Sequence, residues 1–337
     1  MVMNMKYSLF LGVLLLVTSC MKEIDLEDLR PDPKLVLNSV ASQGEPLKAS
    51  LSRTWFYTED YPNVSISDAK VNLYVNDRLF EEMTWEVEEF EYYTIGNYIS
   101  SYIPVSGDKV RIEAERDGFK EIVARETIPH KPALLNLTAE EIKNLEPYSS
   151  GKKKRIKVTF KDDPNAVNCY LINFSIGRPY YEYDYENPDN PPVYSGEYYW
   201  NQPSIDYASE PLFGNSISIL DKVMGNDWLS ARNGRPFSDE LINGKEYTMK
   251  LEGDSYYWST MDYDEPDSVR VYLYAISESY YKYLFALLSL YEGSLNSDLA
   301  SAGLAEPIRV FSNIEGGVGI FGTACVDSLT VAVPKLR

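Results

Sequence analysis

The residue with the clearest chemistry in this sequence is Cys20, whose thiol we expect to carry a lipid. One positive charge at Lys6 precedes the apolar run 7–17, and Thr18 and Ser19 stand directly before the cysteine. This run is shorter than the about 20 residues that span a bilayer and has the length of a signal-peptide core. The layout is typical of a bacterial lipoprotein signal, which is cut before the cysteine that becomes acylated.

Two other interpretations of this leader stay open. The first is an ordinary cleaved signal with an incidental cysteine. The second is a transmembrane anchor, although no stop-transfer charges follow at the right distance. Acyl chains such as palmitate contribute about 0.8 kcal/mol per buried methylene, so a lipidated Cys20 would hold the protein stably on a membrane. The acidic segment 21–28 resembles signals that export lipoproteins to the outside of the outer membrane, and a plain acidic spacer would look similar.

The composition indicates a folded, acidic protein. Of 337 residues, 44% are hydrophobic and 13% aromatic, which supports real cores and argues against disorder. The formal net charge is −19, and removal of the 19-residue leader with its single Lys6 leaves 318 residues at −20. Such a charge argues against nucleic acid as a partner and against binding of anionic lipid through the protein body.

The sequence does not display a recognised catalytic motif. The chain has one histidine, His130, which excludes every site that needs two imidazoles. Zinc-protease, nucleophilic-triad and P-loop patterns are missing, so we expect no enzyme activity, no cofactor and no metal. A glycoside hydrolase stays open as an alternative, because it needs only two carboxylates and the chain holds 51 acidic residues.

Two cysteines remain after the anchor, Cys169 and Cys325. Because an exported protein meets oxidising conditions, a disulfide between them is one expectation. Two unpaired thiols in the core are the other.

The segment 178–200 has the most biased composition, with seven tyrosines among acids and prolines. Tyrosine offers rigid, amphipathic contact area at low entropy cost, and tyrosine and tryptophan with carboxylates also suit sugar stacking. We therefore predict a ligand or partner contact here, and the alternative is a long hairpin whose tyrosines pack on the domain. The candidate contact residues are Tyr181, Tyr183, Tyr185, Tyr198, Tyr199 and Trp200.

The first half of the mature chain alternates between apolar and polar residues. Val71 and Leu73 lie on one face of a predicted strand that ends at an Asn76-Asp77 turn. Segments such as 78–87 continue the pattern, which predicts about seven short strands in an antiparallel sandwich of immunoglobulin or transthyretin type.

The second half predicts a larger β domain with one packed helix. Ser277 caps a helix over 278–290, whose apolar stripe is Tyr281, Leu284, Phe285 and Leu288. We also predict a short helix at 139–145. The fold class is therefore mainly β, with two sandwiches in tandem. The predicted parts are a signal peptide at 1–19, an acylated linker at 20–33, an N-terminal sandwich at 34–130, a connector at 131–151 and a C-terminal domain at 152–337.

Near the end of the chain, a glycine-rich stretch precedes a strand-like segment, so it predicts a tight turn where backbones approach closely rather than a phosphate-binding loop. The stretch resembles the C-terminal signature of the DUF4249 family of Bacteroidetes lipoproteins. Its residues in this motif include Ser312, Asn313, Gly316, Gly317, Gly319, Phe321 and Gly322. The segments 68–73, 127–129 and 276–284 agree with the resemblance, which covers nearly the whole mature chain.

Family members are often encoded near TonB-dependent outer-membrane transporters, and the family offers no catalytic residues to carry over. The resemblance thus implies a non-catalytic accessory or binding partner of such a transporter, lipid-anchored in the outer membrane and exposed at the cell surface. A surface lipoprotein that binds a glycan or another ligand, such as a peptide, is the alternative function.

Overall fold

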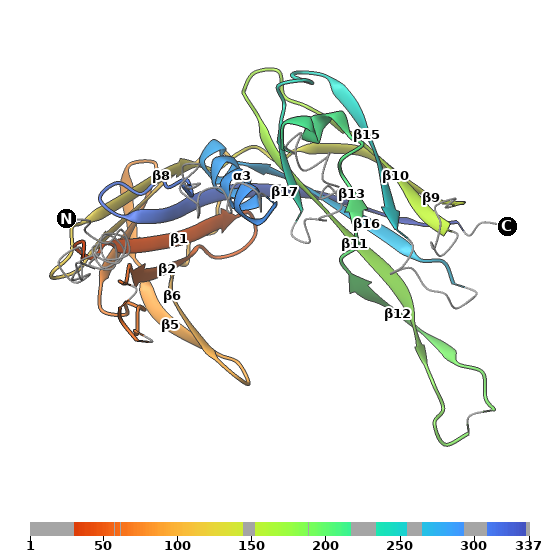
Figure 1. Ribbon diagram of the computed structural model, residues 1–337, viewed down its shortest axis with the longest axis horizontal. Helices are drawn as coiled ribbons and strands as arrows, with labels where there is room; N and C mark the ends of the chain where they lie inside the picture. Colours follow the sequence, from red (N-terminus) through yellow and green to blue (C-terminus); the bar gives the residue numbers. More distant parts are fainter. Residues whose placement is uncertain are drawn as a thin grey trace, which may run out of the picture.

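The computed structural model describes residues 30–56, 58–60, 62–143, 152–187, 189–216, 234–254, 265–292 and 309–334. The predicted leader and Cys20 lie outside these residues. Strands dominate the described chain, which confirms a mainly β fold (Figure 1). Among the described residues, no helix is both long and apolar enough to cross a bilayer.

Eight strands come before the linker near residue 130. They are β1 (Leu35–Ser42), β2 (Lys48–Arg53), β3 (Lys70–Val75), β4 (Arg78–Glu82), β5 (Thr84–Glu89), β6 (Thr94–Ile99), β7 (Lys109–Glu115) and β8 (Ile122–Thr127).

The rest of the described chain adds nine strands, a 3-10 helix and an α-helix. They are β9 (Ala133–Lys143), β10 (Lys152–Lys161), β11 (Cys169–Glu182), β12 (Val193–Asn201), β13 (Ile205–Asp206), η2 (Pro211–Ser216), β14 (Arg235–Ser238), β15 (Glu246–Asp254), β16 (Ser268–Ile276), α3 (Glu278–Glu292) and β17 (Val318–Ala332).

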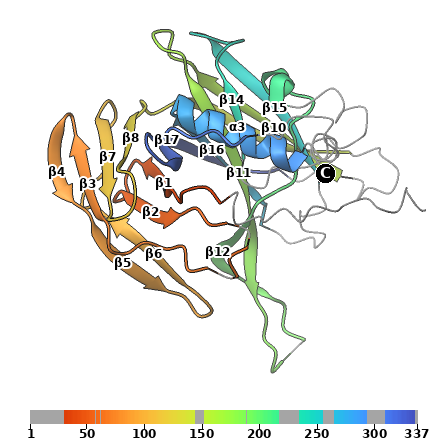
Figure 2. The ribbon, with the colours of Figure 1, turned by 60° about the vertical axis from the view of Figure 1, so that its left-hand side comes forward.

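One long sheet runs through the whole molecule, and two small sheets pack on it. The nine-stranded sheet has the order β12-β11-β16-β17-β1-β2-β6-β5, with β14 paired to β11. The four-stranded sheet β4-β3-β7-β8 packs on the strands of the long sheet that come from the first half of the chain. The four-stranded sheet β13-β15-β10-β9 packs on the strands of the long sheet that come from the second half (Figures 1 and 2). The α-helix α3 packs near β17 at the junction.

Strand β17 joins the two halves of the molecule. Its residues 318–324 pair in parallel with β1, and its residues 324–332 pair antiparallel with β16. The end of the chain therefore contributes to the sheet of the first half as well as to that of the second. Because one hydrogen-bonded strand passes through both halves, their relative position is fixed by a continuous sheet.

Two separate cores fill the halves. In the first, inward residues of β3 alternate as predicted, with Val71 and Leu73 fully buried. In the second, Ile172 and Phe174 of β11 meet Val271 and other inward residues of β16. Each core has an inward face from the long sheet and one from a small sheet, which is the layered packing that a half-wet strand pattern favours.

The predicted turn after β3 is confirmed. Asn76 and Asp77 have φ values of 51° and 64°, as a two-residue hairpin turn with both central residues left-handed requires. The strand-like segment predicted at 78–87 is divided between two strands, however. The chain leaves β4 at Glu82 and enters β5 at Thr84, and between them the buried Met83 anchors a crossing from one sheet to another.

The short helix predicted at 139–145 is also wrong over its described residues, since residues 139–143 belong to β9. Residues 144 and 145 lie outside the described part of the chain. The stretch is rich in good helix formers, but Leu137 and Ala139 alternate inward and the strand pairs along β10. Across that pair, Glu141 accepts a hydrogen bond of 2.7 Å from the buried Lys154 ammonium. Tertiary pairing thus overrides local helix propensity here.

The predicted helix is confirmed as α3. The Ser277 hydroxyl accepts a hydrogen bond of 3.4 Å from the Tyr280 amide, which caps the helix start. Tyr281 and Leu284 of the predicted stripe pack in a small cluster with Cys169. The helix therefore covers the outer face of the long sheet beside β11 and β17.

The two cysteines are free and buried, so the structure has two core thiols rather than a disulfide. Cys169 faces the cluster under α3, whereas Cys325 lies in the first core, with its Sγ atom 3.7 Å from the Ser106 hydroxyl. The side chains thus belong to different packing clusters.

Candidate functional site

The β11–β12 hairpin extends beyond the sheet that carries it. Strand β11 pairs with β16 only as far as Gly177, but it continues alongside β12 to Glu182. Residues 178–201 therefore form a two-stranded projection, which we call the β11–β12 arm and which points away from the body in Figure 1. Since a two-stranded ribbon is marginally stable alone, its own side chains must brace it.

A row of aromatic rings along the arm provides this bracing. Ring centroids of Tyr181 and Tyr194 lie 5.7 Å apart, those of Tyr194 and Tyr198 lie 6.1 Å apart, and those of Tyr198 and Trp200 also 6.1 Å. At the base, the Arg270 guanidinium lies 4.0 Å above the Trp200 ring, a cation–π contact. The row fixes the arm to the sheet.

The six predicted contact residues divide into two groups. Tyr181, Tyr198 and Trp200 are half-buried members of the aromatic row, so they brace the arm. Tyr183, Tyr185 and Tyr199 are exposed, with Tyr185 at 87% of its full accessibility near the tip. The structure thus combines the two interpretations of this segment, because some tyrosines pack and others face solvent.

The arm is also acidic. It carries five carboxylates and one arginine, a net charge of −4. Asp184 organises the tip, since its Oδ1 accepts hydrogen bonds from the amides of Glu186 and Asn187 at 3.1 and 3.0 Å. Hydrogen bonds from Asn190 and Asn187 lower the pKa of Asp184, so this carboxylate stays ionised. The ordered, anionic tip thus presents the exposed Tyr183 and Tyr185.

Sequence reasoning missed a second cluster of exposed rings, on the β5–β6 hairpin. Phe90, Tyr92 and Tyr93 all lie at its tip and all are exposed. The available signal was the run of aromatic and acidic residues at 85–93.

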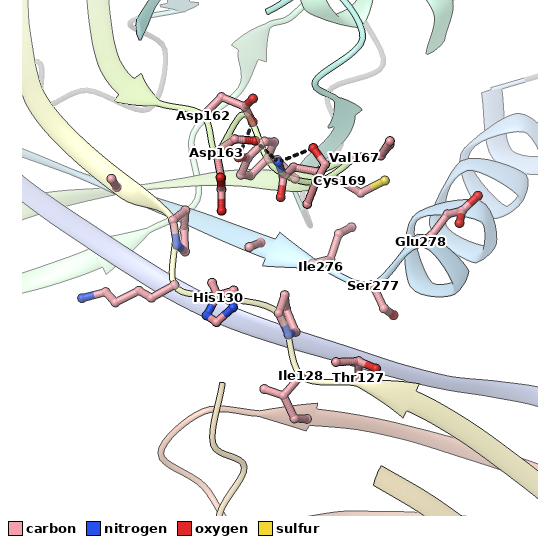
Figure 3. A pocket seen from close by; sticks show the side chains of 18 of the residues that line it. Thr127, Ile128, His130, Asp162, Asp163, Val167, Cys169, Ile276, Ser277 and Glu278 are labelled. Atoms are coloured by element: carbon pink, nitrogen blue, oxygen red, sulfur yellow. Dashed lines mark hydrogen bonds between the residues drawn. The ribbon is translucent and has the colours of Figure 1, made fainter. Parts of the chain in front are cut away.

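A cleft of about 600 Å³ lies where the two halves meet (Figure 3). Its walls are the linker 127–133, the β10–β11 turn and the start of α3. Its lining includes His130, the aspartates Asp162 and Asp163, and Cys169. These residue types could serve hydrolytic chemistry, so the arrangement of their side chains decides whether the cleft is a candidate active site.

The two aspartates of the cleft accept hydrogen bonds from neighbouring residues and so stabilise the local fold. The Tyr170 hydroxyl and the Gly244 amide each donate a hydrogen bond of 2.6 Å to the buried Asp162. Asp163 accepts hydrogen bonds from the backbone and side chain of Asn165, and these bonds lower the pKa of Asp163. Both carboxylates therefore hold the β10–β11 turn.

The thiol and the imidazole of the cleft do not form a catalytic pair. Burial raises the pKa of the Cys169 thiol to about 12, which suppresses the thiolate. In Figure 3, Cys169 points toward α3, whereas His130 lies on the linker at the opposite wall. Among the described residues, no group of three or more His, Cys, Asp or Glu side chains could hold a metal ion.

The glycine-rich motif builds the junction itself. The Asn313 side-chain amide donates hydrogen bonds to Glu126 Oε1 at 2.9 Å and to the Phe321 carbonyl at 2.8 Å, and it accepts one from the Phe321 amide at 2.9 Å. Burial raises the pKa of Glu126, which also accepts hydrogen bonds from Ser277 and Ser279 at the start of α3. The motif thus ties β17 to β8 and to the helix.

The motif glycines allow backbones to approach closely, as predicted. A Cβ atom at Gly317 would lie 2.6 Å from the Leu35 carbonyl oxygen, and one at Gly322 would lie 2.7 Å from the ring of Tyr280. Gly316 has a φ of 81° and Gly319 one of 118°, backbone conformations that favour glycine. This stretch therefore has a structural role in the fold.

The chain belongs to the family described as Domain of unknown function (DUF4249), whose family profile matches residues 22–330. The match spans both halves and the junction motif. None of the curated, characterised proteins matches the chain.

Proposed function

We propose that this protein is a non-catalytic, lipid-anchored protein of the outer membrane, exposed at the cell surface, that binds a TonB-dependent transporter. The anchor rests on the Cys20 signal, and the choice of transporter rests on the family resemblance. The observation that carries the binding role is the β11–β12 arm. Its tip exposes Tyr183 and Tyr185 on a braced ribbon that the core of the protein does not require.

Exposed aromatic rings on an ordered scaffold favour recognition. An unbraced loop pays entropy when it binds, whereas the row from Tyr181 to Trp200 already holds the ribbon in one conformation. Tyrosine adds rigid contact area with a polar end, which suits a protein partner. The cleft carboxylates Asp162 and Asp163 accept hydrogen bonds that hold the β10–β11 turn, and this supports a role without catalysis.

Co-purification tests this proposal. Full-length protein with an affinity tag is extracted from detergent-solubilised outer membranes and its companions are identified by mass spectrometry. We expect a TonB-dependent transporter with the wild type and loss of it, roughly tenfold or more, with Tyr183, Tyr185 and Tyr199 all changed to Ser. The matched control changes the exposed Val167 and Leu241 to Ser, away from the arm, and should retain the transporter. Recovery of the wild type alone would contradict the proposal.

The anchor has its own test. Cys20→Ala should release the protein from the membrane fraction, because the acyl chains supply the membrane affinity. Unchanged membrane association of this variant would contradict the proposed lipid anchor at Cys20.

Glycan binding is the second candidate, because exposed tyrosines lie among carboxylates on the arm. Trp200 is poorly placed for a sugar, since Arg270 covers one face of its ring and the ring also lies against Gly177. Stacking would therefore fall on Tyr183 and Tyr185. A glycan array whose hits vanish when both become Ser would favour this function, and an array without hits would exclude it.

A further inference from the structure

The β5–β6 hairpin is a second projection, at the opposite end of the long sheet. Strand β6 pairs with β2 only at Tyr98 and Ile99, whereas β5 and β6 pair from Thr84 and Ile99 out to Glu89 and Thr94. The outer part, residues 86–97, therefore stands beyond the sheet as a two-stranded ribbon. We call residues 84–99 the β5–β6 arm.

The two arms share one construction at their bases. In the β5–β6 arm the Trp85 ring lies directly over Gly96, where any Cβ atom would overlap it. In the β11–β12 arm the Trp200 ring lies against Gly177, where a Cβ atom would come within 3.0 Å. A bare glycine beneath a tryptophan lets the ring lie flat on the ribbon, which stiffens it.

The tip of the β5–β6 arm also exposes aromatic rings. The rings of Phe90 and Tyr93 stack with centroids 4.8 Å apart, and Tyr92 between them in the chain is 86% exposed. Val87 and Ile95 extend the exposed apolar surface along the ribbon. Single exposed apolar residues are common, but a cluster at the tip of a projection marks a contact surface.

Both arms carry the same charge. The β5–β6 arm has four glutamates and no basic residue, a net charge of −4, and the β11–β12 arm also has −4. Clustered carboxylates beside exposed rings repel an anionic membrane surface and attract cations. The partner that fits is thus a protein surface whose Lys and Arg side chains meet the carboxylates and stack on the rings.

The arms are held in fixed relation to one another. They lie at the two ends of a single sheet order, from β12 to β5, and β17 joins the halves without a break. Both hairpins project to the same side of the molecule in Figures 1 and 2. One partner can therefore meet both tips, and the second contact then gains from the first through effective concentration.

We infer that the two arms form one two-point docking surface for a single, positively charged protein. This inference deepens the proposed function and rests on it, because it names the chemistry of the partner surface and adds the β5–β6 arm. The two contacts are cooperative, so loss of either arm weakens the whole complex.

Photo-crosslinking in the cells that make the protein tests the inference. The crosslinking residue p-benzoylphenylalanine replaces Tyr92, Tyr185 or, as a control, the exposed Leu241 in three separate full-length variants. We expect crosslinks from the first two positions to the same polypeptide, in Lys- and Arg-rich segments, and none from the control. A second set adds Glu86→Gln, Glu89→Gln and Glu91→Gln to the Tyr92 variant, and we expect roughly tenfold weaker crosslinking.

The control for the charge change neutralises three exposed acids elsewhere, Asp117, Glu121 and Glu246, and should leave the crosslink unchanged. A crosslink from position 185 without one from 92 would overturn the two-point surface and leave the proposed function intact. Crosslinks from neither position would overturn both. Attachment to polysaccharide or lipid, or a yield unaffected by the three Gln changes, would overturn a basic protein partner.

Discussion

Gly319 lies opposite Leu37 in the parallel β1–β17 pair, and the Leu37 carbonyl oxygen occupies the space that a Cβ atom at residue 319 would need. Because this pair joins the last strand to the first, the contact governs how the two halves are held together. The φ of 118° at Gly319 adds a backbone requirement to the steric one.

Gly319→Ala should therefore destabilise the whole protein. We expect a loss of about 3–5 kcal/mol in the free energy of unfolding, since strain at a special φ adds to overlap with backbone. Gly44→Ala is the matched control, because Gly44 has a φ of 91° but open space around its Cβ position, and it should cost about 1 kcal/mol. Denaturant unfolding measures both. Equal losses would show that the approach of Leu37 is unimportant.

Trp85→Ala should loosen the β5–β6 arm without unfolding the core. The ring rests on Gly96 and meets Tyr98 edge to face at 5.1 Å, and its removal leaves a bare two-stranded ribbon. We expect amide hydrogen exchange of residues 86–97 to rise roughly tenfold or more. Trp55→Ala, at an exposed ring outside the arm, is the control. Unchanged exchange in the arm would mean that the tryptophan does not brace it.

The two thiols should resist modification in the native protein. Cys169 is buried with its pKa raised to about 12, and burial also raises the pKa of Cys325. Iodoacetamide at neutral pH should label neither residue until denaturant is added, and then it should label both without a reducing agent. If labelling of the unfolded chain required prior reduction, the cysteines would be bonded.

Glu126 should make stability depend on pH in an unusual direction for a carboxylate. Burial raises its pKa in the folded protein, so the neutral form is the one that the fold favours. The stabilising contribution of Glu126 is thus complete below its unfolded pKa and is lost as the pH rises through the raised folded value.

Glu126→Gln removes this titration. We expect the melting temperature of the variant, relative to that of the wild type, to increase by a few degrees as the pH rises from 4 to 7. Glu121→Gln, at an exposed carboxylate just before β8, should follow the wild type. Melting curves recorded across this pH range would contradict the assignment if the Glu126→Gln and wild-type values stayed parallel.

Local patterns predicted much of the fold. The alternation through Val71 and Leu73, the Asn76-Asp77 turn and the cap at Ser277 are each settled within a few residues, and the structure confirms them. The same reasoning failed for residues 139–143, because they form a strand that depends on pairing with β10, a partner that local propensity does not include. The division of β17 between two sheets is likewise a matter of long-range pairing.

The candidate site was only partly predictable for the same reason. The tyrosine bias at 178–200 identified the β11–β12 arm, but composition could not separate the bracing Tyr198 from the exposed Tyr199, since this depends on which face meets the neighbouring ring. The β5–β6 arm was not predicted, because Phe90 and Tyr92 stand among glutamates in the sequence and give no separate aromatic pattern. Overhang beyond a sheet becomes visible only when strand register is known.

Hydrogen exchange in outer-membrane vesicles tests the central claim most directly, because it detects contact at the arm without knowledge of the partner. Amides at the tip of the β11–β12 arm, residues 183–192, are compared between native vesicles and the purified full-length protein. We predict exchange at least tenfold slower in vesicles at the tip, with unchanged rates around the exposed Leu241. Equal exchange at the tip in the two preparations would contradict a binding role for this protein's arm.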